Sequence, residues 1–224
     1  PEQKDLRNII VLDEYSEFRL AGDHTAFWMP GDYDTNEYSY TTGKVSEIEA
    51  KKSRDYAGLS YKTVKDQIVV QTPLMMKSTD GIYINIHEAA LTDFSVMQLN
   101  VDKKTLSFSS HLTPDALGNK AYLTAPSQTP WRTVIAADNA PEILESKTIL
   151  NLNEPSVIED TEWIKPVKYV GIWWEMHVNK SSWNYADIPI KNLKDINWKE
   201  VKPNGRHGAT TERTKQYIDF AAKH

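Results

Sequence analysis

Short segments with the pattern of β-strands recur through the first 135 residues of this 224-residue chain. In residues 14–20, polar and apolar side chains broadly alternate, as they do in a strand that lies with one face on a core. Comparable segments, separated by turn signals such as Asp80-Gly81, are residues 67–76, 82–87, 96–101, 105–109 and 131–136. Short strands at this spacing are typical of antiparallel sandwiches, so a mainly β fold is predicted. Residues 51–55 fit either a loop or a short helix.

The pattern changes near residue 140. Pro141 followed by Glu142 predicts the first turn of a short helix over residues 139–146. An apolar run then predicts a strand over residues 167–174, and Thr210 is a suitable N-cap for a helix over residues 211–223. Together these form one βα unit, which cannot bury itself because a parallel strand needs neighbours on both sides and cover on both faces. We therefore expect two regions, residues 1–160 and 161–224, in a segment of a longer protein.

Composition excludes several classes of function. The chain has 26 Lys and Arg against 31 Asp and Glu, a net charge of −5 without a basic stripe, so neither nucleic acid nor an anionic membrane is an expected partner. No run approaches the roughly 18 apolar residues of a transmembrane helix, and residues 1–5 lack the apolar core of a signal peptide. The absence of cysteine excludes thiol catalysis, cysteine zinc sites and disulfides. The 7 Trp, 11 Tyr and 5 Phe suit either a dense β core or a sugar-binding surface.

One carboxylate has an unusual place in the segment 81–93. If this segment is a strand, Glu88 lies on the same face as Ile82, Ile84 and Ile86. Burying an uncompensated carboxylate there costs several kcal/mol. Three explanations stay open: Glu88 emerges at the end of the strand, pairs with a cation, or binds a metal ion. Asp93 is expected to be a turn residue.

A second candidate site lies at residues 169–177, where two rings, a carboxylate and an imidazole follow an apolar run. In α/β barrels and open α/β sheets, the carboxyl end of a strand is where chemistry takes place. Strand parity places Trp173 and Glu175 in a mixed row that we expect to face a barrel interior, with His177 just beyond. The alternative is that the tryptophans pack in a core and that Glu175 and His177 belong to a solvated loop.

Taken together, four motifs make the chain resemble glycoside hydrolase family 97. They are Ile86-His-Glu-Ala-Ala-Leu91, Thr129-Pro-Trp-Arg-Thr133, Tyr169-Val-Gly-Ile-Trp-Trp-Glu-Met-His177 and the ending His207-Gly-Ala-Thr-Thr-Glu-Arg-Thr-Lys-Gln-Tyr-Ile-Asp-Phe-Ala-Ala222. The resemblance implies an N-terminal antiparallel β-super-sandwich, a (β/α)8 barrel and a C-terminal β-domain. This chain is similar to the later sandwich strands, the linker and the first βα unit of the barrel. Periplasmic localisation is also implied by the resemblance.

The same resemblance implies a function. Glu88 would be the sandwich residue that ligates a calcium ion beside the sugar. Trp173, Glu175 and His177 are expected to bind substrate because of their place at the end of the predicted strand. The catalytic acid and base of the family lie on later barrel strands, so no catalytic residue is expected here and the segment alone should be inactive. The expected function is part of a calcium-dependent α-glucosidase acting on starch-derived oligosaccharides, with the remainder of the barrel as its partner. The alternatives are an α-galactosidase of the same family and a non-catalytic carbohydrate-binding module.

Overall fold

The computed structural model describes residues 7–50, 68–188 and 196–224, and the chain divides into two compact units, residues 1–156 and 157–224. Residues 51–55, for which a loop or a helix was expected, lie outside the described residues. The strands of the first unit are β1 (Asn8–Val11), β2 (Glu17–Arg19), β3 (Thr25–Trp28), β4 (Thr41–Lys44), β5 (Val69–Val70), β6 (Leu74–Lys77), β7 (Tyr83–Ala89), β8 (Met97–Asp102), β9 (Ser107–Leu112), β10 (Ala121–Thr124) and β11 (Trp131–Ala137). Its helices are the 3-10 turn η1 (Val45–Glu47), α2 (Ala140–Glu145) and α3 (Thr148–Asn151).

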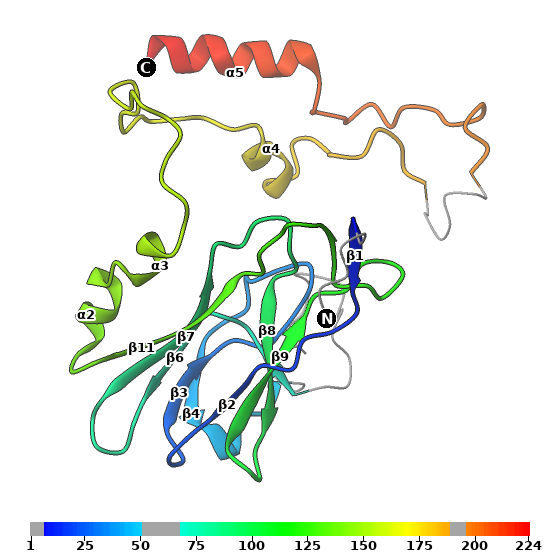
Figure 1. The fold of residues 1–224 in the computed structure, drawn as a ribbon. Coiled ribbons are helices and arrows are strands. Elements are labelled where there is room, and N and C mark those ends of the chain that lie inside the picture. The colour runs from blue at the N-terminus through cyan, green and yellow to red at the C-terminus, as the bar shows by residue number, and fades with distance from the viewer. Residues whose placement is uncertain (1–6, 51–67, 189–195) are drawn as a thin grey trace. The chain divides into compact units, whose positions relative to one another are not determined.

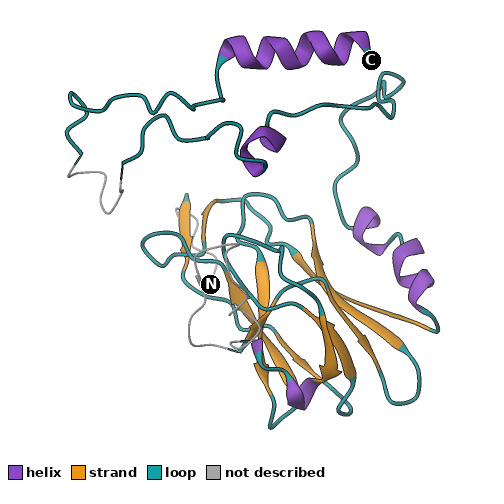
Figure 2. Cartoon of the chain, turned by 180° about the vertical axis from the view of Figure 1, so that it is seen from behind, coloured by secondary structure: helices purple, strands orange, loops and turns teal. Residues whose placement is uncertain are grey.

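The described strands of the first unit form three antiparallel sheets (Figures 1 and 2). A five-stranded sheet has the order β11-β7-β6-β3-β4, a four-stranded sheet has the order β2-β9-β8-β5, and β1 pairs with β10. One buried cluster joins the two larger sheets, with Trp28, Met76 and Ile86 from the first and Leu99 and Phe108 from the second. Side chains from two facing sheets that share one core are the arrangement of a β-sandwich. The mainly β, antiparallel prediction is therefore confirmed.

The expected strand over residues 67–76 is two strands in different sheets. β5 pairs with β8 in the four-stranded sheet, whereas β6 pairs with β3 and β7 in the five-stranded sheet. Pro73 lies between them and has no backbone N–H to donate to a ladder, so the chain leaves one sheet there and enters the other. The crossing places β6 beside β7, the strand that carries Glu88.

The short helix after β11 forms as expected. α2 begins after Asn139, whose side-chain oxygen accepts a hydrogen bond from the Glu142 N–H at 3.2 Å, and Pro141 lies in its first turn. Such a cap satisfies one of the unpaired N–H groups at a helix start. α3 follows directly, in a stretch for which no helix was predicted. Asn153, just after α3, accepts a hydrogen bond from the Ala90 N–H at 3.1 Å and so ties this stretch to the end of β7.

The second unit contains α4 (Trp173–His177) and α5 (Thr211–Lys223). The α5 prediction is confirmed, and Thr210 caps the helix by accepting from the Arg213 N–H at 3.1 Å. The predicted strand over residues 167–174 is wrong, because residues 165–171 have no regular structure and Trp173 begins a helix. A parallel strand requires hydrogen-bonded neighbours, and within the described part of this unit the strand pairing is confined to one isolated bridge between Ser182 and His207. That residues 161–224 form the start of a barrel stays a prediction.

Within the described residues, we find no helix that is both long and apolar enough to cross a membrane.

Candidate functional site

Glu88 lies near the end of β7, directly opposite Arg132 on β11. Its Oε2 atom pairs with Arg132 Nη1 at 2.5 Å, and the Met97 N–H donates to both carboxylate oxygens, at 3.2 and 3.3 Å. Only 5% of the residue is exposed, and it shares the buried side of the strand with Ile86. Of the three explanations for the place of Glu88 on the isoleucine face, the structure therefore supports the second: Glu88 is buried and paired with a cation.

Arg132 also binds a second carboxylate. Glu14, between β1 and β2, accepts from Arg132 Nε at 2.8 Å and from Nη2 at 2.6 Å, which is a bidentate pair. The guanidinium also lies 5.8 Å from the centre of the Phe94 ring. We call Glu14, Glu88 and Arg132 the Glu88 cluster. Because two carboxylates surround one guanidinium, the cluster has one excess negative charge.

Burial and charge act in opposite directions on the acids of the Glu88 cluster. Burial raises the pKa of Glu88 above its ordinary value, although the Met97 N–H and the Arg132 charge oppose that shift. Burial would also raise the pKa of Glu14, but hydrogen bonds from Arg132 and Ser16, with the Arg132 charge, outweigh it and lower that pKa. Burial would lower the pKa of Arg132, but its two carboxylate partners outweigh that effect and raise the pKa. The guanidinium therefore stays charged and holds both acids.

The Glu88 cluster can offer a metal ion one ligand atom. Calcium takes six to eight oxygen ligands, and among the described residues no group of three or more His, Cys, Asp or Glu side chains could hold a metal. A complete calcium shell is therefore not available from them. Oε1 of Glu88 accepts no hydrogen bond from Arg132, and its sole hydrogen bond to the described part of the chain is the 3.2 Å bond from Met97. One carboxylate oxygen thus fits a calcium ion whose other ligands come from elsewhere.

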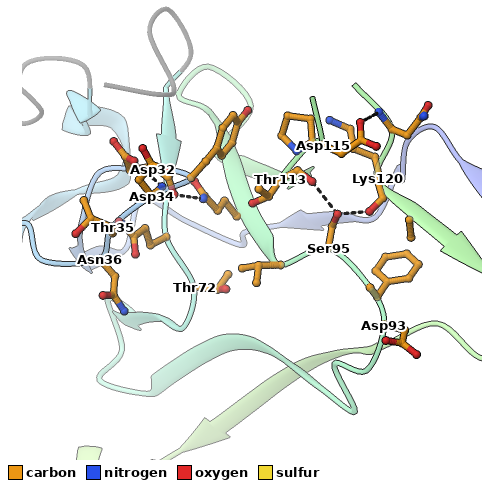
Figure 3. A pocket seen from close by; sticks show the side chains of 18 of the residues that line it. Asp32, Asp34, Thr35, Asn36, Thr72, Asp93, Ser95, Thr113, Asp115 and Lys120 are labelled. Atoms are coloured by element: carbon orange, nitrogen blue, oxygen red, sulfur yellow. Dashed lines mark hydrogen bonds between the residues drawn. The ribbon is translucent and has the colours of Figure 1, made fainter. Parts of the chain in front are cut away.

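A cavity of about 710 Å³ opens in the first unit (Figure 3). Phe94 both lines this cavity and contacts Arg132. Carboxylates of Asp34, Asp93 and Asp115 also line it. Asp93, expected in a turn, has a φ of 49° and follows the end of β7. The lining comes from several loops far apart in sequence, so sequence patterns gave no signal for the cavity.

In the second unit, Trp173 and His177 share one face of α4. Residues four apart on a helix lie one above the other, and these two rings are 5.5 Å apart. Both line a cavity of about 810 Å³, together with Tyr169, Trp174 and Tyr217. Aromatic walls with polar tips suit the flat apolar faces of sugars. Two of the three expected substrate residues are therefore brought together, and their contact with substrate stays a prediction.

Glu175 lies on the opposite side of α4. It is 8% exposed, and its Oε1 atom forms an ion pair with Nη2 of Arg213 on α5. It lines a separate cavity of about 370 Å³ with Ser181 and His207. The strand parity that grouped Glu175 with Trp173 fails because residues two apart on a helix point about 200° apart. A role for Glu175 in substrate binding stays a prediction.

Arg132 and Glu14 were not predicted to be members of a site. Arg132 belongs to one of the four motifs, but its partner depends on how β11 aligns with β7. Glu14 is 118 residues away from Arg132. A pattern of local alternation carries no information about such pairings.

Comparisons with known proteins point to one family. A family model described as the glycosyl-hydrolase 97 N-terminal region matches residues 1–155. A retaining alpha-galactosidase from Bacteroides thetaiotaomicron is 23% identical over 241 residues, covering 95% of this chain and 31% of that protein. Solved structures of a glycoside hydrolase family 97 enzyme from Pseudoalteromonas sp. strain K8 are also similar. A variant of it is 36% identical with a TM-score of 0.67, and its acarbose complex is 35% identical with a TM-score of 0.65.

A second variant of that enzyme, solved in complex with panose, is 36% identical with a TM-score of 0.65. Each of these three structures covers 100% of this chain, and the chain covers 28% of each. The chain therefore spans less than a third of the length of the relatives it matches.

Proposed function

The chain belongs to glycoside hydrolase family 97, and we propose that it is the sandwich-to-barrel segment of a calcium-dependent α-glucosidase acting on starch-derived oligosaccharides. The observation that carries this proposal is Glu88, a buried carboxylate near the end of β7 with one oxygen that accepts no hydrogen bond from Arg132. In this proposal, residues 161–224 begin the barrel, and the remainder of the barrel is their partner. We also propose a periplasmic location, on the family resemblance alone.

Two relatives support different substrates. The Pseudoalteromonas enzyme, 35–36% identical, has been solved with acarbose and with panose. Both are oligosaccharides with α-linked glucose units. The Bacteroides protein, 23% identical, is a retaining alpha-galactosidase. The higher identity favours a glucoside, and a galactoside is the alternative.

Glu88 is proposed as one ligand of a calcium ion through its Oε1 atom. A bound calcium ion would stabilise negative charge that develops on oxygen during cleavage of the glycosidic bond. Glu88 itself would do nothing to the bond; it would supply charge and one ligand atom at a fixed place. Glycosidases need two further carboxylates that flank the scissile bond, and we assign neither to this chain.

The second unit is proposed to contact the sugar. Trp173 and His177 would provide aromatic surface on the face of α4 that lines the larger cavity. Glu175 remains the third proposed substrate residue, on the other face of α4. Many large apolar side chains of this unit are exposed, among them Trp163, Tyr169, Trp174 and Phe220. The remainder of a barrel would cover such side chains, so their exposure supports a barrel partner.

The test measures cleavage of an aryl α-glucoside and an aryl α-galactoside by the full-length protein. We expect cleavage of the glucoside that is lost on calcium chelation and restored by added calcium. The 224-residue chain alone should cleave neither substrate. A full-length protein that binds oligosaccharides but cleaves neither would establish the non-catalytic module instead. Cleavage that survives exhaustive chelation would contradict the calcium proposal while leaving the glycosidase assignment intact.

A further inference from the structure

The geometry of the Glu88 cluster points to a role for two residues that no motif assigns. We propose that Arg132 is a positioning residue that holds the Glu88 carboxylate for a divalent cation, and that Glu14 holds Arg132 in turn. This inference rests on the proposed function, in which Oε1 of Glu88 is a calcium ligand.

The guanidinium of Arg132 is fixed before it reaches Glu88. Glu14 uses two of its donor nitrogens, Nε at 2.8 Å and Nη2 at 2.6 Å. A planar guanidinium held in a bidentate pair has its plane and direction set. The donor directions of the remaining nitrogen, Nη1, are therefore fixed as well, and Oε2 of Glu88 lies 2.5 Å from it.

The carboxylate of Glu88 is in turn held at two points. Arg132 donates to Oε2. The N–H of Met97, on β8 of the four-stranded sheet, donates to both oxygens. These contacts oppose rotation of the carboxylate about its last torsion. Outer partners that orient a ligand in this way are as characteristic of metal sites as the ligands themselves.

The segment that carries Glu14 is itself anchored. The Ser110 hydroxyl on β9 donates to the Glu14 carbonyl at 2.6 Å, and the Ser110 N–H donates to the Ser16 carbonyl at 2.9 Å. The Glu88 cluster therefore joins β7 and β11 of one sheet to β9 of the other. Movement of one sheet against the other would displace the ligand atom.

Charge in the cluster also favours a cation. The side chains of Arg132 and Glu88 are 11% and 4% exposed, so water screens their charges weakly. With one guanidinium between two carboxylates, one negative charge remains uncompensated. A simple pair of Glu88 and Arg132 would be neutral and would attract a divalent cation less.

The test measures the calcium dissociation constant of the full-length protein by calorimetry. The variants are Arg132→Met, Arg132→Lys and Glu14→Gln, with Glu88→Gln as the reference for loss of the ligand. Arg19→Gln is the matched control, because Arg19 forms an exposed pair with Glu17 at 3.3 Å. We expect calcium binding to weaken about 10-fold to 100-fold in Arg132→Met and Glu14→Gln, with partial recovery in Arg132→Lys. Arg19→Gln should bind as the wild type does.

The sign of the Arg132→Met effect separates positioning from simple charge. If Arg132 acted only as a nearby positive charge, its removal would strengthen calcium binding, and that result would overturn the proposal. Unchanged binding in folded Arg132→Lys and Glu14→Gln would overturn it too, and these two variants serve if Arg132→Met fails to fold. If Glu88→Gln loses calcium while the Arg132 and Glu14 variants do not, the positioning role alone fails. A wild type that binds no calcium contradicts both the role and the proposed function.

Discussion

Each unit of this chain contains a buried glutamate paired with an arginine, and the two pairs have different surroundings. Glu88 and Arg132 lie opposite each other on neighbouring strands, with 4% and 11% of their side chains exposed. Glu175 is similarly buried, but 43% of the Arg213 side chain is exposed. The first arginine has a second carboxylate partner, Glu14.

The two pairs differ in exposure because different amounts of protein surround them. The sandwich covers Glu88 with two sheets and one continuous apolar core. Glu175 lies on the five-residue helix α4 and reaches α5, a helix without a buried residue. An ion pair gains from a low dielectric only where its neighbours keep water out. The same chemical pair is therefore expected to be strong in the first unit and weak in the second.

The largest expected difference concerns the two arginines. Arg132→Met leaves the buried Glu88 and the partly buried Glu14 without their cation, and we expect a loss of about 3–5 kcal/mol in the free energy of unfolding of the sandwich. Arg213→Met should cost about 1 kcal/mol or less, since α4 can turn Glu175 toward water. Urea denaturation with hydrogen exchange of β7, β11, α4 and α5 measures both. Equal losses in the two variants would end the distinction between the two pairs.

Two glycines provide a second comparison that does not involve charge. A Cβ on Gly31 would lie 2.5 Å from Cγ1 and 2.9 Å from Cβ of Val69, which is fully buried. A Cβ on Gly208 would lie 2.5 Å from Oγ and 2.6 Å from Cβ of Ser181. We expect Gly31→Ala to cost about 1–3 kcal/mol, because a packed core cannot shift. Gly208→Ala should cost less, and a larger loss there would show that the second unit is as tightly packed as the sandwich. Thermal and urea unfolding of both variants give the values.

Acid should weaken the sandwich through Glu14. Its folded pKa is lowered from 4.5, so its ionised form contributes stability that is fully present above pH 4.5 and is lost as the pH falls through the folded value. In Glu14→Gln this contribution is absent, and the free energy of unfolding should fall less steeply on acidification. Calcium-free urea titrations between about pH 3 and pH 6 measure the slope. Glu17→Gln controls for the loss of a nearby charge. Parallel slopes for Glu14→Gln and the wild type would contradict the buried pair.

The smallest effect is expected for the exposed pair of Arg19 and Glu17, whose side chains are 73% and 51% exposed. Arg19→Gln should change the free energy of unfolding by a few tenths of a kcal/mol, since solvent screens such pairs. A loss close to that of Arg132→Met would mean that burial does not explain the strength of the Glu88 cluster. Urea denaturation at two salt concentrations measures the change.

Sequence pattern predicted the parts of the fold whose signals are local. The strands β7, β8, β9 and β11 and the helices α2 and α5 follow from alternation and caps. β4, with the sequence Thr-Thr-Gly-Lys, was missed because it lies at the edge of its sheet and has no apolar alternation. The strand predicted over residues 167–174 does not form, because a local apolar run does not supply the hydrogen-bonded neighbours that a strand needs.

The candidate site, too, has parts that local sequence patterns predict and parts that they do not. The placement of Glu88 beside the isoleucines was visible in the sequence, because parity within one strand is local. Its partner Arg132 depends on the alignment of β7 with β11, and Glu14 depends on contact between the two sheets. Trp173 and Glu175 were grouped by a strand parity that the helix α4 does not have. Register and sheet contacts are properties of the folded chain and need coordinates.

Calcium titration of the full-length protein tests the central claim, that Glu88 supplies a calcium ligand, most directly. Calorimetry would compare the wild type with Glu88→Gln and with Glu175→Gln, the corresponding change in the other buried pair. We predict that calcium binds Glu88→Gln more than about 10-fold more weakly, since loss of an outer partner alone costs that much. Glu175→Gln should bind calcium as the wild type does. If Glu88→Gln binds calcium as tightly as the wild type, Glu88 is not a ligand and its pairing with Arg132 serves the fold alone.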